Sequence, residues 1–333
     1  FVSMAYTLTP VPELGDPVIT NDLPGPLLDV LDFAPLVREF YRRSVISSKL
    51  DDYIKEYKTD SDAVLRRSAR EMVSELLDYL HTRPKLTFTE KVLTTTTKKG
   101  TKNTTLQQVE TREHERRFFL VPEKLAAKGT INFLNIRDDY YVIVPPDTDL
   151  SFSEVRRAFL QFVIDPLVLN NAKEIAVVRG FVKPLLDEKR KNNPSITPDL
   201  FLAVTRSLVA AVDVKQAEFA RLKIATEQSR AKILTLKSDD EKKRLTDELK
   251  AYEQSLADES LQHLYEDYEK GAVLSFYFAD QLKGIEDSGF DIGASLKEML
   301  LAFDASKEGD RVASTAEARK RALATREERK IKP

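Results

Sequence analysis

The chain of 333 residues lacks cysteine, and it has few histidines and glycines. The absence of cysteine excludes disulfide frameworks, thiolate zinc sites and cysteine nucleophiles, and it leaves the redox compartment open. The three histidines, His81, His114 and His263, lie far apart in the sequence, so no histidine metal cage or catalytic triad is evident. Ten glycines, with neither GxxxxGK nor GxGxxG among them, argue against a nucleotide-dependent enzyme.

A dominant charge is also missing. Lys and Arg number 52 and Asp and Glu number 54, which leaves a net charge of −2. Such a balanced chain has no overall field to attract a polyanion, so we expect no nucleic-acid partner. No apolar run approaches the roughly 18 to 20 residues that span a bilayer, so we expect no transmembrane segment. The first residue is Phe rather than Met, so a targeting signal upstream of it is not visible.

Hydrophobic periodicity predicts helices early in the chain. Residues 1–33 are rich in Pro, Gly and Asp and predict an extended segment. From Ala34, apolar residues recur at helical spacing as far as Tyr57, and Asp60–Asp62 offers caps for a further helix that ends near Pro84. We therefore expect a helical unit before residue 85.

A change of period predicts strands in the next sixty residues. Residues 86–97 and 104–109 flank a Lys-Lys-Gly turn and predict a β-hairpin. Three more strands are expected at residues 117–121, 131–136 and 140–144, and Pro145 and Pro146 end the last of them. Residues 34–146 should therefore combine the helical unit with one small antiparallel or mixed β-sheet.

Everything after residue 147 has helical periodicity. Pro166 should end or bend the first helix, and a second should run over residues 172–186, followed by a polar loop. Thr197-Pro198 is expected to start a long helix, which pairs with a second one to make an antiparallel helical hairpin over residues 212–270. Another helix should open at Lys270-Gly271, and residues 306–333 should form a charged C-terminal helix or tail. The predicted fold class is α+β and predominantly helical.

The first of these helices carries a resemblance. Its sequence, VRRAFLQFVIDPLV over residues 155–168, follows a strand that reads YYVIV. This order resembles gluzincin-type (HExxH) zinc metallopeptidase domains of uncharacterised bacterial families, over roughly residues 35–305. In those relatives the helix carries His-Glu-x-x-His a few residues before Pro-Leu-Val. The resemblance implies a peptidase-like helical domain made of residues 147–211 and 271–305, with the hairpin inserted, and an extracytoplasmic location.

The residues at the motif positions depart from the pattern. Arg157 stands at the first histidine, Ala158 at the catalytic glutamate and Gln161 at the second histidine, and the third ligand falls near Thr205 and Arg206. A permanently charged arginine repels a metal ion instead of coordinating it, and alanine cannot accept a proton. The sequence therefore predicts a vestigial site without metal, cofactor or catalytic residue. Arg157 is expected to pair with Glu154 or Asp165.

Four interpretations stay open. The helix over residues 151–166 can be an ordinary amphipathic core helix, with Arg157 and Gln161 on its solvent-facing side and no ancestral site. The protein can be an inactive metallopeptidase-like protein that binds a peptide or protein segment, for instance along an exposed sheet edge. It can act as an interaction protein through the 212–270 hairpin. It can also be a hydrolase with unrecognised carboxylates, such as Asp165 and Glu174. The sequence does not predict the partner or the oligomeric state.

Overall fold

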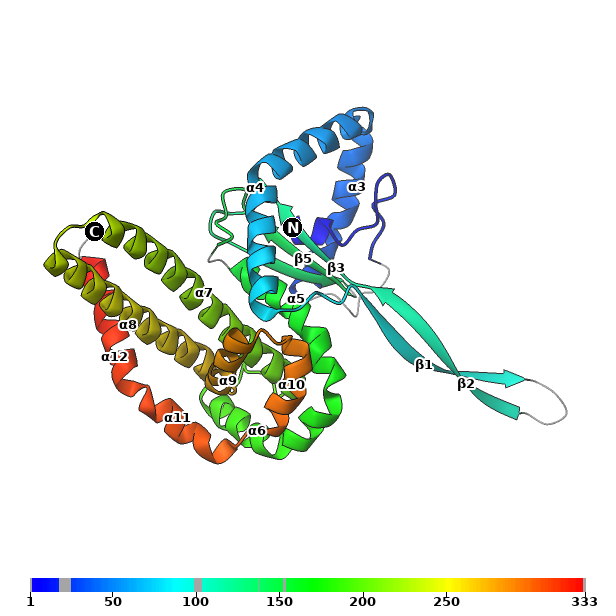
Figure 1. The fold of residues 1–333 in the computed structure, drawn as a ribbon. Coiled ribbons are helices and arrows are strands. Elements are labelled where there is room, and N and C mark those ends of the chain that lie inside the picture. Colours follow the sequence, from blue (N-terminus) through cyan, green and yellow to red (C-terminus); the bar gives the residue numbers. More distant parts are fainter. Residues whose placement is uncertain (1, 18–24, 99–103, 137, 152–153, 332–333) are drawn as a thin grey trace. The chain divides into compact units, whose positions relative to one another are not determined.

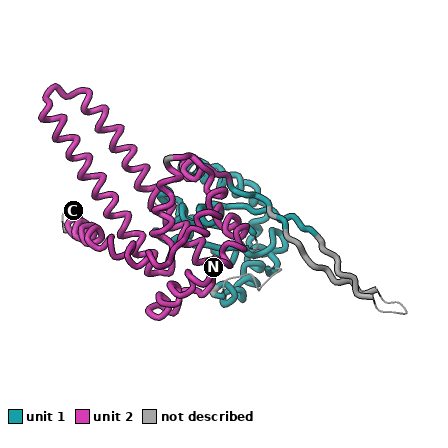
Figure 2. The backbone as a smooth tube through the Cα atoms, turned by 60° about the horizontal axis from the view of Figure 1, so that its bottom comes forward, with its two compact units in different colours: residues 1–73, 84–162 teal, residues 74–83, 163–333 magenta. Residues whose placement is uncertain are grey.

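A computed structural model describes residues 2–17, 25–98, 104–136, 138–151 and 154–331. Helices dominate and the strands are few, so the fold is α+β and predominantly helical, as predicted (Figure 1). The chain divides into two compact units, residues 1–73 with 84–162 and residues 74–83 with 163–333 (Figure 2). Within the described residues, no helix is long and apolar enough to cross a membrane.

The first unit begins with short helices and one long one. They are α1 (Val2–Ala5), α2 (Gly25–Leu28), η2 (Leu31–Phe33), α3 (Ala34–Arg43), η3 (Ile46–Lys49) and, up to residue 73, α4 (Leu50–Leu80). Met4, Leu8 and Ala34 form a small core of their own, so the expected extended segment is partly helical and is tied to α3. The helix start at Asp60–Asp62 was wrong, because α4 is continuous there. Asp62 instead accepts a hydrogen bond from Arg66, one turn later, at 3.0 Å.

The strands form two sheets where one was expected. β1 (Thr87–Lys98) and β2 (Thr104–Glu115) pair only with each other among the described strands, in antiparallel register with Thr94 opposite Gln108. The predicted turn between them falls mostly in residues 99–103, outside the described residues. β3 (Arg117–Pro122), β4 (Asn132–Ile136) and β5 (Asp139–Val144) make a second, mixed sheet in the order β3-β5-β4. β5 is parallel to β3 and antiparallel to β4.

Helix α5 (Glu154–Asn170) covers one face of the mixed sheet through aromatic side chains. Phe118 of β3 meets Phe159 edge-on at 5.3 Å between ring centroids, and Tyr140 of β5 meets Phe162 in the same way at 5.3 Å. Side chains alternate across a strand, so Ile143 of β5 points to the other face, where it is fully buried. The central strand β5 is therefore buried on both faces at Val142 and Ile143.

The sequence predicted that Pro166 ends or bends α5. The helix does not end there, because it continues to Asn170. Proline has no N–H, so the carbonyl of Phe162, four residues earlier, loses its usual helical donor. The guanidinium of Arg116 supplies a substitute, since its Nη2 donates to Phe162 O at 2.8 Å. Arg116 is only 5% exposed, and its Nη1 donates to Lys85 O at 3.0 Å.

The second unit is a set of packed helices. They are α6 (Ala172–Asn192), α7 (Leu200–Thr235), α8 (Asp239–Glu269), α9 (Ser275–Ser288), α10 (Ile292–Leu301), η4 (Ala305–Lys307), α11 (Glu308–Ser314) and α12 (Ala316–Ile331). Residues 236–238 join α7 to α8, and the two helices lie side by side (Figure 1). α9 packs on both of them near the end of α8. α12 lies along α8, so the charged C-terminal segment is part of this unit (Figure 1).

Three boundaries in this unit differ from the prediction. α6 continues beyond the predicted end at Leu186 to Asn192, and the carbonyl of Lys189 near its end accepts from Asn193 N at 3.0 Å. α7 is capped by Asp199, whose carboxylate accepts from Leu202 N at 3.2 Å, so Thr197 is not the cap. α9 opens at Ser275 and not at Gly271, which has φ +101°. A Cβ at Gly271 would lie 2.7 Å from a methyl group of Ile196, so only glycine fits this turn.

Candidate functional site

The motif positions of the first unit lie on α5. Arg157, Ala158 and Gln161 are half-buried, next to the fully buried Val155 and Leu160. Arg157 and Gln161 are four residues apart and therefore share a face of the helix, the spacing that two metal ligands on one helix would need. Their side chains are a guanidinium and an amide, so this face presents hydrogen-bond donors and no metal-binding nitrogen.

The remaining motif positions belong to the second unit. Thr205 on α7 is buried, with 3% of its surface exposed, and the adjacent Arg206 is exposed. Thr205 is a neutral hydroxyl and Arg206 a fixed cation, so neither can replace the acidic third ligand. Whether these two residues converge with those of α5 stays a prediction. Nowhere in the described parts of the chain do three His, Asp or Glu side chains gather as a metal ion would need.

The mixed sheet offers an edge beside α5. β5 is central, so β4 has a partner on one side only within the described sheet. Leu134 of β4 is buried, whereas Phe133, which shares the α5 face with Val142 of β5, is 47% exposed. Alternate backbone groups of an edge strand point away from the sheet, where they can bond to an added strand. The arrangement therefore combines an open edge with an accessible aromatic ring.

Comparison of this chain with protein-family models, with curated proteins and with solved structures finds no match. The resemblance to gluzincin-type domains therefore depends on the residues of α5 and on the order of the elements. Asp165, on α5, and Glu174, in the first turn of α6, are half-buried. The hydrolase interpretation that uses these two carboxylates remains a prediction.

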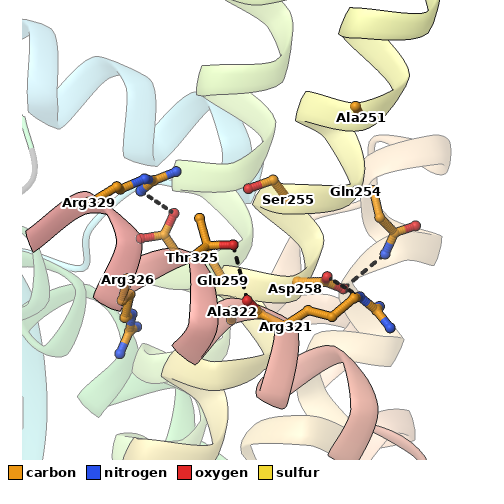
Figure 3. Close-up of a pocket in the computed structure, with 10 residues that line it drawn as sticks. All are labelled: Ala251, Gln254, Ser255, Asp258, Glu259, Arg321, Ala322, Thr325, Arg326 and Arg329. Atoms are coloured by element: carbon orange, nitrogen blue, oxygen red, sulfur yellow. Dashed lines mark hydrogen bonds and ion pairs between the residues drawn. The ribbon is translucent and has the colours of Figure 1, made fainter. Parts of the chain in front are cut away.

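A second candidate site was missed by the sequence reasoning. It is a pocket of about 170 Å³ between α8 and α12 (Figure 3). Its lining is polar apart from two alanines: Ala251, Gln254, Ser255, Asp258 and Glu259 of α8, with Arg321, Ala322, Thr325, Arg326 and Arg329 of α12. The pocket lies entirely within the second unit.

Arginines of α12 form ion pairs with carboxylates of α8 at this pocket. Arg321 donates to both oxygens of Asp258, from Nε and Nη2, at 2.7 Å each, and Gln254 donates to Asp258 at 2.9 Å. Burial alone would raise the pKa of Asp258, but these hydrogen bonds outweigh it and hold that pKa below its usual range. Arg326 donates to Glu266 at 2.6 Å, and the pKa of Glu266 is lowered in the same way, against the effect of burial.

A periodic signal for this pocket was present in the sequence. Arg319, Ala322, Arg326 and Arg329 recur at steps of three and four, which places them on one face of a helix. The sequence predicted only a charged C-terminal helix or tail over residues 306–333, without a partner for it. Arg326 and Arg329 of this stripe pair with Glu266 and Glu259 of α8, and Arg321, just beside the stripe, pairs with Asp258.

Proposed function

We propose that the protein is a catalytically inactive, metallopeptidase-like protein that binds an extended peptide along β4. The observation that carries the proposal is the set of side chains on the face of α5, where Arg157, Ala158 and Gln161 stand at the metal and base positions of the family pattern. Neither coordination of zinc nor activation of water is chemically available to these three side chains. Binding without cleavage is the function that a peptidase-like fold retains.

The sheet edge supports the binding part of the proposal. An extended peptide that pairs with β4 would gain backbone hydrogen bonds from the outward-facing groups of residues 132–136. Its side chains on the α5 side of the sheet would lie beside Phe133, which offers an apolar surface. We therefore expect a preference for an apolar side chain at one position of the peptide.

Peptides selected from a displayed random library test this mode of binding. Strand addition uses every second N–H of the peptide, so N-methylation of one alternating set should weaken binding at least about tenfold, whereas methylation of the other set should not. Phe133→Ala should reduce affinity several-fold. Leu125→Ala is the matched control, because Leu125 is 81% exposed and lies outside β4. Equal tolerance of both methylated sets would contradict strand addition.

The distal part of α7 and α8 favours a second candidate function, capture of a protein partner. Between residues 217 and 255 no residue is buried, and Ile224 and Leu234 are 56% and 86% exposed. Nearly forty residues of paired helix thus contribute nothing to the described core. Deletion of residues 223–250 leaves the buried part of both helices in place. It should abolish partner capture if this surface binds, and leave peptide binding to β4 unchanged.

A further inference from the structure

We propose that the pocket between α8 and α12 is a binding site for a small monocarboxylate. The lining has three arginines and two carboxylates, so it carries one surplus positive charge. Outside the lining, Arg221 pairs with Glu259, Glu266 with Arg326, and Glu317 acts on Arg321. One negative charge on a ligand would therefore balance the charges of the lining itself.

Arg329 provides the surplus charge. Two of the three arginines are engaged, since Arg321 binds Asp258 and Arg326 binds Glu266 through short hydrogen bonds. Arg329 only approaches Glu259, at 3.9 Å, which is beyond hydrogen-bond distance, and Arg221 is closer to the same carboxylate, at 3.6 Å. The guanidinium of Arg329 thus keeps its donors available, in the planar fork that matches a carboxylate.

Ser255 provides a second group for the ligand. Its side chain is half-buried, and the described residues offer its hydroxyl no hydrogen-bond partner. Figure 3 shows this hydroxyl between the Arg329–Glu259 pair and the Arg321–Asp258 pair. Thr325 differs, because its hydroxyl already donates to Arg321 O at 3.0 Å and can only accept. An oxygen held by Arg329 can therefore also receive the hydrogen of Ser255.

The dimensions limit the ligand to a small acid. The volume of about 170 Å³ is several times the roughly 30 Å³ that a water molecule occupies in the liquid. Ala251 and Ala322 line the same pocket and leave an apolar surface for a short alkyl group. A carboxylate with one to three carbons beyond the charged group satisfies both the polar and the apolar parts of the lining. The ligand would touch α8 and α12 at once and so hold the two helices together.

Saturation-transfer NMR with propionate on the full chain tests the site, at constant ionic strength set with sodium chloride. Wild-type protein should transfer saturation to the propionate methyl group, with a dissociation constant about tenfold lower than that of Arg329→Gln, the order expected for one charge-assisted contact. Ser255→Ala should weaken binding several-fold. Lys330→Gln is the control, because Lys330 pairs with Glu327 and does not line the pocket.

Two results would overturn the proposal. One is the absence of transfer to propionate, or transfer that is unchanged in Arg329→Gln. The other is displacement of propionate by inorganic phosphate at equal concentration, because a site that prefers phosphate is a general anion site and not one for a planar carboxylate. Circular dichroism of each variant verifies that α12 is still folded, and the peptide-binding assay on β4 is independent of either result.

Discussion

At the scale of single residues, two neighbouring arginines have opposite roles. Arg116 is buried, donates to the carbonyls of Lys85 and Phe162, and stacks over the ring of Phe162 at 4.5 Å. The side chain of Arg117 is 59% exposed and pairs with Asp139 at 2.6 Å at the rim of the mixed sheet. The sequence alone does not tell which of the two arginines is buried. Adjacent residues at the start of a strand point to opposite faces, and the local pattern does not say which face other elements will cover.

Replacement of each arginine by methionine measures the difference. Arg116→Met leaves two carbonyls without their donor, and we expect a loss of about 2–4 kcal/mol in the free energy of unfolding. Arg117→Met removes one exposed ion pair, for which we expect roughly 0–1 kcal/mol. Urea denaturation followed by circular dichroism gives both values. Similar losses in the two variants would contradict the role assigned to Arg116.

At the scale of elements, the strands were predictable and several helix boundaries were not. Short runs rich in aromatic and β-branched residues located β3, β4 and β5 to within two residues, because such runs are a local signal for strands. The helix start at Asp60 was wrong, and of the two outcomes expected at Pro166, an end or a bend, the end was wrong. A proline ends a helix only where the surrounding structure leaves the freed carbonyl without a donor. At Pro166 that carbonyl belongs to Phe162, and the guanidinium of Arg116 donates to it.

A double-mutant cycle tests this explanation of α5. Pro166→Ala restores an N–H that can donate to the carbonyl of Phe162, so that carbonyl no longer depends on Arg116. Arg116→Met should therefore cost about 1 kcal/mol less in the Pro166→Ala background than in the wild type. Additive effects, measured by the same denaturation experiment, would show that the hydrogen bond to Phe162 does not compensate for the proline.

The attachment of α12 should depend on pH. The folded-state pKa values of Asp258 and Glu266 are lowered, so their contribution is complete above the unfolded values near pH 4 and is lost as the pH falls through the folded values. Burial raises the pKa of Glu308 in α11, so protonation of that group has the opposite, stabilising sense. The hydrogen-exchange protection factors of residues 316–331 should fall on acidification from pH 5 to pH 3 by more than those of α7.

Salt provides the control for this prediction. Ala322 is the buried apolar residue of α12, and the other contacts that hold the helix to α8 are mainly ionic. Addition of about 1 M sodium chloride at pH 7 shortens the screening length to roughly 3 Å and should also accelerate exchange in α12. Protection factors in α12 that respond to neither pH nor salt would mean that apolar packing, and not the ion pairs, holds it.

At the scale of the whole molecule, the sequence predicts the chemistry of the motif positions but not where they lie in space. Arg157 keeps its charge and cannot coordinate a metal ion in any fold, and Gln161 lacks the nitrogen, thiolate or carboxylate that zinc prefers, so the absence of zinc is a prediction made from side-chain chemistry. Their spatial relation to Thr205 and Arg206 depends on contacts between segments far apart in the chain, which no local pattern encodes. The pocket between α8 and α12 escaped prediction for the same reason, because it forms only when two distant helices pair.

The zinc content of the purified full chain, equilibrated with one equivalent of zinc and then freed of loosely bound metal, tests the central claim most directly. The account predicts far less than one zinc per chain, because the α5 face offers only an arginine, an alanine and a glutamine at the motif positions. One zinc per chain, lost in Gln161→Ala and accompanied by cleavage of an unstructured protein such as casein, would contradict it.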